Sequence, residues 1–369
     1  MREIRRILIV GLTSNPGGME TFIMNIYRRF DKTKYQFDFL TTDATMAFSE
    51  EAEELGGRIF FAPQKRKGVA AYRAYLETLF TENHFLAVCY QRCRRLTDLS
   101  VFAIAKAKGV PIRVLHSHST KILNPSFSYR VLSALAFPRL SHYINYFFAC
   151  SPDAGRWMFG NRPFTVIPNC IETERFTPNS ERRKQIRNRL HAEGKVVLGT
   201  VGRLSDVKNP LYLLEIACEL KKRAFPFVFW HVGEGELYSK MSELINERGL
   251  KQDFLLLGSQ KDIPTYMDGM DLFLLPSLYE GFPMVLMEAQ ASGLPCLVSE
   301  AVTRDANLSG ELHFLPLTDG VSTWADAIES TVVPSVRQGY AELLREKGYD
   351  LGRLVERMEA FLDQIEEEE

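Results

Sequence analysis

The chain has 369 residues, of which 46% are hydrophobic and 25% are charged, values that are typical of globular proteins and exclude the disordered and coiled-coil classes. It contains 45 lysines and arginines against 46 aspartates and glutamates, so it is not a uniformly basic protein. At roughly 100–200 residues per domain, this length predicts two or three domains.

The chain up to residue 170 alternates short apolar runs with helical patterns. Runs typical of strands lie at residues 6–11, 36–40, 58–61, 85–90, 112–116 and 146–150. Apolar residues at helical spacing lie between them, at 18–30, 69–81, 97–108 and 126–141. Apolar strands that alternate with helices predict a parallel sheet covered on both faces, which is a doubly wound α/β domain.

The same pattern begins again after residue 194. Strands are predicted at 195–202, 227–232, 254–257, 272–275 and 296–299, with a helix at 210–223. We therefore predict an N-terminal domain at residues 1–170, a second domain at 171–350, and a C-terminal helix at 351–369 that packs back on the first domain. Such sheets bind ligands at the carboxyl ends of their strands, so a cleft between the two domains is the expected site.

Charge is distributed unequally between these domains. Residues 1–170 carry 23 lysines and arginines against 13 acidic residues, whereas residues 171–369 carry 22 against 33. This asymmetry predicts an anionic partner for the N-terminal domain, with an ordinary solvated surface as the alternative. Nucleic acid is not expected, because the basic residues have no aromatic residues interleaved and match no known binding module.

The sequence contains no apparent targeting segment. No signal-peptide core follows the N-terminus, and no apolar stretch approaches the roughly 18 residues of a membrane-spanning helix. The six cysteines lack the paired spacing of metal ligands. We expect a cytoplasmic protein, either free or peripheral on the inner face of the cytoplasmic membrane.

Common nucleotide-binding motifs are absent. The first strand is not followed by G-x-G-x-x-G, and no G-x-x-x-x-G-K-[ST] loop occurs, which argues against dinucleotide dehydrogenases and P-loop enzymes. No Asp-x-Asp pair is present to hold a metal-bound diphosphate. A phosphate ligand would therefore be bound by cationic side chains and helix ends.

The segment 271–288, DLFLLPSLYEGFPMVLME, contains the strongest candidate site. A predicted strand is followed by a loop with Glu280 and Gly281, and a helix is predicted to start near Pro283. The free amides of such a helix start bind anionic oxygens and hydroxyls. Glu280 and Glu288 are spaced so that two carboxylates hold the two ends of one polyhydroxylated ligand.

These motifs resemble those of glycosyltransferase family 4, the retaining GT-B enzymes. The E-x7-E pattern in EGFPMVLMEAQASGLPCL is similar to the donor-binding signature of that family, and VGRLSDVKNP is similar to its phosphate-binding segment, with Arg203 and Lys208. VIPNCIETERF resembles its interdomain motif, with Cys170 where glycine is usual. PGGMETFIMNIYR and LHSHST are most similar to the exopolysaccharide and capsule subgroup.

The resemblance implies a GT-B fold, with two Rossmann-like domains facing each other across a cleft. It assigns catalytic roles to His116, Arg203, Lys208 and Glu280. The donor-binding residues that it implies are Gly17, Gly18, Gly202, Gly258, Gly281, Phe282, Pro283, Met284, Val285 and Glu288. His118, Thr120 and Lys121 are candidates for the acceptor side. Which of His116 and His118 lines the active site stays open, because strand alternation turns one of the pair aside.

The function implied is retaining, metal-independent transfer of a hexose or N-acetylhexosamine from a nucleotide diphosphate sugar, expected to be a UDP-sugar. The acceptor would be a polysaccharide or a lipid-linked saccharide, with no cofactor and no bound metal. In such a family the basic N-terminal domain would attract an anionic membrane surface. The alternatives are another GT-B enzyme of nucleotide sugars (a 2-epimerase or an inverting transferase) and a non-catalytic sugar-nucleotide-binding protein.

Overall fold

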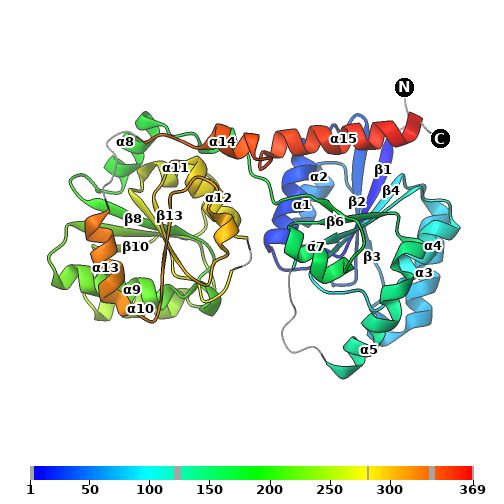
Figure 1. The fold of residues 1–369 in the computed structure, drawn as a ribbon, viewed down its shortest axis with the longest axis horizontal. Coiled ribbons are helices and arrows are strands. Elements are labelled where there is room, and N and C mark those ends of the chain that lie inside the picture. Colours follow the sequence, from blue (N-terminus) through cyan, green and yellow to red (C-terminus); the bar gives the residue numbers. More distant parts are fainter. Residues whose placement is uncertain (1–3, 120–125, 281, 332–336, 368–369) are drawn as a thin grey trace. The chain divides into compact units, whose positions relative to one another are not determined.

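The computed structural model describes residues 4–119, 126–280, 282–331 and 337–367 (Figure 1). The chain divides into two compact units. The first unit contains Met1–Cys170 together with Leu351–Glu369, and the second contains Ile171–Asp350. Each unit has one parallel sheet with helices on both faces, so the predicted doubly wound α/β class is confirmed.

The sheet of the first unit has seven strands in the order β3-β2-β1-β4-β5-β6-β7. Their bounds are β1 Arg5–Val10, β2 Tyr35–Thr41, β3 Ile59–Phe61, β4 Ala87–Arg92, β5 Ile112–Ser117, β6 Tyr146–Ala149 and β7 Thr165–Val166. The helices of this unit are α1 Gly18–Arg29, α2 Ser49–Glu54, α3 Val69–Glu82, α4 Ser100–Ala107, α5 Phe127–Ala136, α6 Leu140–Tyr143, α7 Pro152–Phe159 and α15 Leu351–Glu367. The strand order reverses between β1 and β4, where α/β sheets commonly bind ligands.

Alternation along the strands divides the first core into two layers. Ile112 and Val114 of β5 pack on the face covered by α1 and α15, whereas Leu115 packs on the opposite face, under α3, α4 and α7. His116 shares the side of Ile112 and Val114 because side chains two residues apart point the same way. This register decides where the candidate histidine lies.

Helix α15 belongs to the first unit although it ends the chain, and Figure 1 shows it alongside α1. The hydroxyl of Tyr35 donates to Asp363 (2.6 Å), and the backbone N–H of Asp31 donates to Glu359 (2.7 Å). Leu354 and Leu362 are buried against the sheet. The last helix therefore completes one face of the N-terminal core.

The sheet of the second unit has six strands in the order β10-β9-β8-β11-β12-β13. Their bounds are β8 Val196–Val201, β9 Phe227–Val232, β10 Phe254–Leu256, β11 Leu272–Leu275, β12 Cys296–Ser299 and β13 Leu312–Leu315. The helices are α8 Ser180–Arg189, α9 Pro210–Lys222, α10 Tyr238–Glu247, α11 Ile263–Gly269, α12 Met284–Ala291, α13 Gly320–Ser330 and α14 Ala341–Glu346.

A buried carboxylate anchors α8 to the start of this sheet. Asp271, next to β11, accepts from Arg183, from Arg187 (2.8 Å) and from the backbone N–H of Val197 (2.7 Å). Burial alone would raise the pKa of Asp271, but these hydrogen bonds hold it below its ordinary value. The carboxylate thus stays charged and ties the helix to β8 and β11.

The structure differs from the predicted elements in several places, and the helices α2 and α7 are among the elements that were not predicted. The short strands β7 and β13 were not predicted from the apolar pattern. The single helix predicted at 126–141 is interrupted, since α5 ends at Ala136 and a 3-10 turn at Phe137–Arg139 precedes α6. Pro138 lies in that turn and lacks the N–H that a continuous helix needs. Within the described ranges, no helix is both long and apolar enough to cross a membrane.

Candidate active site

Two loops at the carboxyl ends of β8 and β9 pack backbone against backbone. The N–H of Gly202 donates to Val232 (2.9 Å), and that of Leu204 donates to Glu234 (3.0 Å). Gly233 has φ +135°, and a Cβ there would lie 2.1 Å from the carbonyl oxygen of Gly202. Only glycine allows this approach, so the turn fixes the backbone of the loop that carries Arg203.

A third loop, after β10, joins this arrangement. The N–H of Gly233 donates to the carbonyl of Gly258 (2.8 Å), and the N–H of Ser259 donates to Oε1 of the Glu234 side chain (3.4 Å). Gly258 has φ +67°, a left-handed conformation that glycine adopts readily. The loops after β8, β9 and β10 therefore form one backbone-bonded edge of the second sheet.

Lys208 and Glu280 meet at this edge. Their Nζ and Oε1 atoms are 2.5 Å apart, and the Ser277 hydroxyl, which is fully buried, donates to the same Oε1 (2.9 Å). The N–H of Leu278 donates to the carbonyl of Val207 (2.8 Å), which joins the two loops by their backbones as well. The cation after β8 and the carboxylate after β11 thus form one half-buried ion pair.

Arg203 is in a different environment. Its side chain is 65% exposed and pairs with the exposed Glu236 at 3.1 Å. An ion pair this exposed adds little stability, so the guanidinium is free to change partner at small energetic cost. The edge therefore carries one fixed cation, Lys208, and one that can be redirected.

Helix α12 begins beside this pair. Pro283 occupies the cap position and the helix starts at Met284, one residue later than the sequence suggested. The first amides of the helix, at Met284 and Val285, precede the first intrahelical bonds and are suited to anionic oxygens. Phe282 stacks on Tyr349, with ring centroids 5.5 Å apart, which holds the entry to the helix. Gly281 lies outside the described residues.

Glu288, in α12, is a half-buried carboxyl group. No hydrogen-bond donor among the residues that the structure describes reaches its oxygens. Burial raises the pKa of Glu288 to about 7, and the positive charge of Arg175 opposes this shift. A carboxyl group in this position can bind a ligand that brings its own hydroxyl donors.

In the first unit, Gly17 and Gly18 stand at the start of α1. Glu20 accepts from the N–H of Gly17 (3.2 Å) and from the N–H of Thr13 (3.1 Å), so one carboxylate holds the loop that follows β1. A Cβ at Gly17 would lie 2.9 Å from Glu20, whereas a Cβ at Gly18 would meet nothing within 4 Å. The capping role of Glu20 was not predicted from the sequence.

The two candidate histidines lie together at the end of β5. Their ring centroids are 4.1 Å apart. His116 is 4% exposed, and burial together with the neighbouring His118 lowers its pKa well below the ordinary value. His118 is half-buried, and its Nε2 lies 2.7 Å from Oε1 of Gln91. Burial lowers the pKa of His118 to about 3, so both rings are neutral near pH 7. Thr120 and Lys121 lie outside the described residues.

Comparisons with known proteins show the family to which the chain belongs. The family described as "Glycosyl transferases group 1" matches residues 181–305, which include Arg203, Lys208, Glu280 and Glu288. A Bacillus subtilis (strain 168) protein, "Putative glycosyltransferase EpsF", is 36% identical over 360 residues, covering 94% of this chain and 93% of the relative. The chain belongs to the group 1 glycosyltransferases.

Two further similarities refine this assignment. An Escherichia coli "UDP-Gal:alpha-D-GlcNAc-diphosphoundecaprenol alpha-1,3-galactosyltransferase" is 31% identical over 205 residues, covering 54% of this chain and 53% of the relative. The structure titled "Crystal structure of Anabaena Alr3699/HepE in complex with UDP" superposes with a TM-score of 0.75 at 18% identity, covering 98% of this chain and all of the other. The predicted GT-B fold and the prediction of a glycosyltransferase are thus confirmed.

The structure gathers the predicted residues of this glycosyltransferase into two groups. Gly202, Arg203, Lys208, Gly258, Glu280, Phe282, Pro283, Met284, Val285 and Glu288 all belong to the second unit, at the loops and helix described above. Gly17, Gly18, His116 and His118 belong to the first unit. The supporting residues Ser277 and Glu236 were not predicted. Ser277 stands three residues before Glu280, and that spacing was the available signal.

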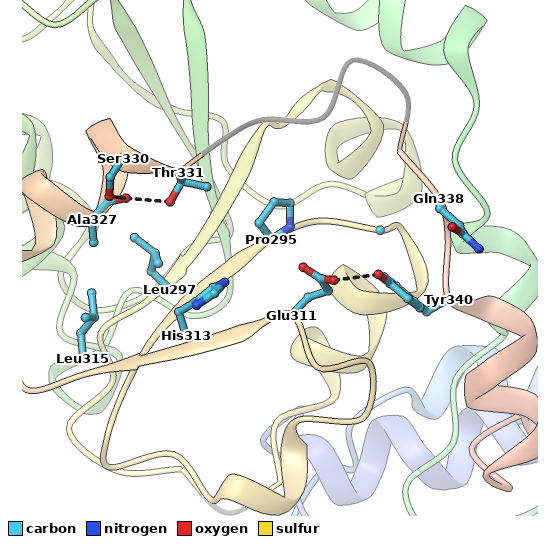
Figure 2. A pocket seen from close by; sticks show the side chains of 11 residues that line it. Pro295, Leu297, Glu311, His313, Leu315, Ala327, Ser330, Thr331, Gln338 and Tyr340 are labelled. Atoms are coloured by element: carbon cyan, nitrogen blue, oxygen red, sulfur yellow. Dashed lines mark hydrogen bonds between the residues drawn. The ribbon is translucent and has the colours of Figure 1, made fainter.

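A pocket of about 590 Å³ lies in another part of the second unit (Figure 2). Pro295 and Glu311, which line it, precede β12 and β13, whereas the candidate site follows β8 and β11. Tyr340 donates to Glu311 across it (2.8 Å). The lining residues Thr331 and Gln338 precede and follow residues 332–336 in the sequence, and those residues are outside the described ranges. We therefore assign no ligand to this pocket. Within those ranges, no group of three or more His, Cys, Asp or Glu side chains is placed to hold a metal ion.

The raised pKa of Glu288 predicts a pH-dependent stability difference. The folded protein keeps the proton of this carboxyl up to about pH 7, whereas the unfolded chain releases it near the ordinary value of 4.5. The contribution of the protonated Glu288 to the stability of the folded protein is therefore complete below pH 4.5 and is lost as the pH rises through 7. The Glu288→Gln variant has no ionisable group at this position. Between pH 4.5 and pH 8 its free energy of unfolding should therefore rise by about 1–3 kcal/mol relative to that of the wild type, measured by urea denaturation.

Glu247→Gln is the matched control, because Glu247 is exposed on α10. Its stability difference from the wild type should stay within about 0.5 kcal/mol across the same pH range. A flat difference for Glu288→Gln would show that this carboxyl group is solvated like Glu247.

Proposed function

We propose that this protein is a retaining, metal-independent glycosyltransferase of family 4. It would transfer a hexose or N-acetylhexosamine from a UDP-sugar to a polysaccharide or lipid-linked saccharide. The observation that carries the proposal is the Lys208–Glu280 ion pair at the carboxyl edge of the second sheet, with Arg203 on the neighbouring loop. Cation, carboxylate and helix start lie together, and a nucleotide diphosphate sugar would bring phosphates to the cations and hydroxyls to the carboxylate.

Two cations suit the departure of a diphosphate. When the bond between the anomeric carbon and the diphosphate oxygen breaks, negative charge grows on that oxygen. Lys208 and Arg203 would stabilise this charge, together with the first amides of α12. This is the work that a divalent ion does in other transferases, and it supports metal independence.

The carboxylates suit the two sugars of the donor. Glu280, held by Ser277, would accept from hydroxyls of the transferred sugar, and Glu288 would accept from the ribose hydroxyls. The donor-binding glycines Gly202 and Gly258 keep the loop backbones close to this edge. The departing phosphate oxygen would take the proton of the acceptor hydroxyl on the same face, which retains the anomeric configuration.

The first unit would receive the acceptor. The E. coli relative is named for a diphosphoundecaprenol-linked acceptor, which supports a lipid-linked saccharide here. Of the two histidines, His118 is the more exposed, so we assign the acceptor contact to it and not to the buried His116. Its neutral ring, paired with Gln91, would orient a hydroxyl by hydrogen bonding.

Removal of the fixed cation tests the donor site. Lys208→Ala should weaken UDP binding by about tenfold to a hundredfold, since a hydrogen bond to a charged group contributes about 1.5–3 kcal/mol. Transfer should fall further, because the charge on the leaving group grows in the transition state. Isothermal titration with UDP and a product assay measure the two effects.

Lys240→Ala removes the same charge from an exposed position on α10 in the same unit. It should leave both UDP binding and turnover unchanged. Equal losses in the two variants would mean that Lys208 acts only through the general electrostatic field, and near-normal turnover of Lys208→Ala would contradict the proposal.

The stereochemistry and the metal requirement are tested together. With an α-linked UDP-sugar donor, NMR of the first product formed should show an α linkage, and turnover should persist in excess EDTA. A β-linked product would make the enzyme inverting. Loss of turnover in EDTA that returns with Mg²⁺ would show that a metal carries the leaving-group charge.

We propose in addition that the first unit attaches to an anionic membrane through α5. Four apolar side chains of this region are exposed, with Phe127 at 82% and Leu135 at 57%, and Val131 lies between them on the same face. Arg130 and Arg139 are exposed beside them, and Arg94 lies over the ring of Tyr129 (5.1 Å). An apolar helix face flanked by arginines is complementary to acidic lipid headgroups.

Vesicle co-sedimentation tests this surface. The wild type should bind vesicles of phosphatidylglycerol and phosphatidylcholine, and weakly bind phosphatidylcholine alone. The double variant Phe127→Ser and Leu135→Ser should lose at least about tenfold in partitioning, because two apolar side chains no longer enter the bilayer. Phe61→Ser, at another exposed apolar residue, in β3, is the control and should bind like the wild type. Equal losses in both would contradict a surface at α5.

A further inference from the structure

A cavity of about 290 Å³ lies inside the first unit, between the sheet and the helices α1 and α15. Its walls come from six adjacent strands and both helices, and nearly all of the lining side chains are apolar. It is separate from the candidate site of the second unit. No residue proposed above for donor binding lines it.

The centre of the sheet is not filled by side chains at this place. Cys89 lies on β4, a central strand, yet it is only half-buried. Phe148 of β6 and Phe361 of α15 are also half-buried and line the same space. Because all three residues line the cavity, the surface that they leave uncovered faces it. Helix α15 thus covers the sheet without packing fully against it.

The cavity reaches the protein surface, where two of its lining residues are exposed. Of its lining residues, Arg357 of α15 and Thr165 of β7 are exposed, and the others are buried or half-buried. Arg357 forms no ion pair with any residue in the described part of the chain. The exposed part of the lining therefore carries a positive charge without a carboxylate partner among the described residues, and the interior is lined by apolar side chains.

The interior does not suit water or a charged group. A buried water needs two to four polar partners, and few polar atoms line this space. His116, in the wall, is neutral near pH 7. A cavity of about 150 Å³ holds one benzene molecule, so about 290 Å³ has room for a chain of about twelve carbon atoms.

We propose that this cavity binds a single hydrocarbon chain of about twelve carbon atoms that ends in an anionic head group, a carboxylate or a phosphate. The chain lies between the sheet and α15, and the head group pairs with Arg357 at the opening, where the Thr165 hydroxyl can also donate. Such a chain fills the space beside Cys89 and packs α15 more firmly on the sheet.

Decanoate and decyl phosphate, each below the concentration at which it forms micelles, are the probes. Isothermal titration should show one site, and binding should raise the Tm by roughly 5 °C at one hundred times the Kd. 1-Decanol should bind about threefold to tenfold more weakly, because it lacks the charge that pairs with the exposed Arg357. Binding of only one of the two anions would identify the head group.

Variants separate this cavity from other apolar surfaces. Cys89→Phe fills the interior and should weaken decanoate binding at least about tenfold. Cys89→Met adds less bulk and serves if the phenylalanine variant does not fold. Arg357→Gln should weaken decanoate by about threefold to tenfold and leave 1-decanol unchanged. Cys218→Phe, in the second unit, and Arg73→Gln, exposed on α3, are the matched controls and should bind like the wild type.

Three results would overturn the proposal: no saturable binding of either anion, equal binding by the Cys89 variants and the wild type, or an Arg357→Gln variant that binds decanoate as tightly as before. None of these measurements depends on sugar transfer, so they stand apart from the test of the proposed function.

Discussion

The ion pair between Lys208 and Glu280 is the interaction on which the edge of the second sheet depends. It connects the loops after β8 and β11, and a buried hydroxyl, that of Ser277, holds the carboxylate in place. Arg203 also has a carboxylate partner, Glu236, so each cation at this edge is neutralised within the protein. A diphosphate would have to exchange with these carboxylates, and the released Glu280 would then face the sugar. Charge balance thus links phosphate binding to sugar binding.

The backbone around these side chains is held by contacts that do not involve the charged groups. Gly233 packs against Gly202, and Gly235 packs against Leu204. A Cβ atom at either glycine would clash with the neighbouring backbone. The loops after β8 and β9 are therefore fixed to each other by carbonyl and amide groups, which carry no net charge. The side chains of Arg203 and Lys208 can change partners on a frame that stays constant.

Strands with continuous apolar runs were predictable, and those at Phe227–Val232, Leu272–Leu275 and Cys296–Ser299 agree with the structure residue for residue. The short β13, LHFL, has no continuous apolar run because His313 interrupts it, and Pro138 was overlooked inside an amphipathic stretch. Most of the donor-binding residues that the family motifs indicated lie in the second unit, whereas Gly17 and Gly18 lie in the first. The hydrogen bond of Ser277, the partner of Arg203 and the cavity beside Cys89 depend on how distant segments pack, which no local pattern records.

The return of α15 to the first unit has a consequence for how the protein is made. During translation the whole of the second unit, Ile171–Asp350, is synthesised before the last helix. Until α15 is synthesised, the sheet face that it covers, which includes Ile7 and Val114, lacks part of its cover. The N-terminal unit therefore completes its core only after the second unit has been synthesised, so a chain that is truncated or stalled before α15 would expose this face to chaperones and proteases.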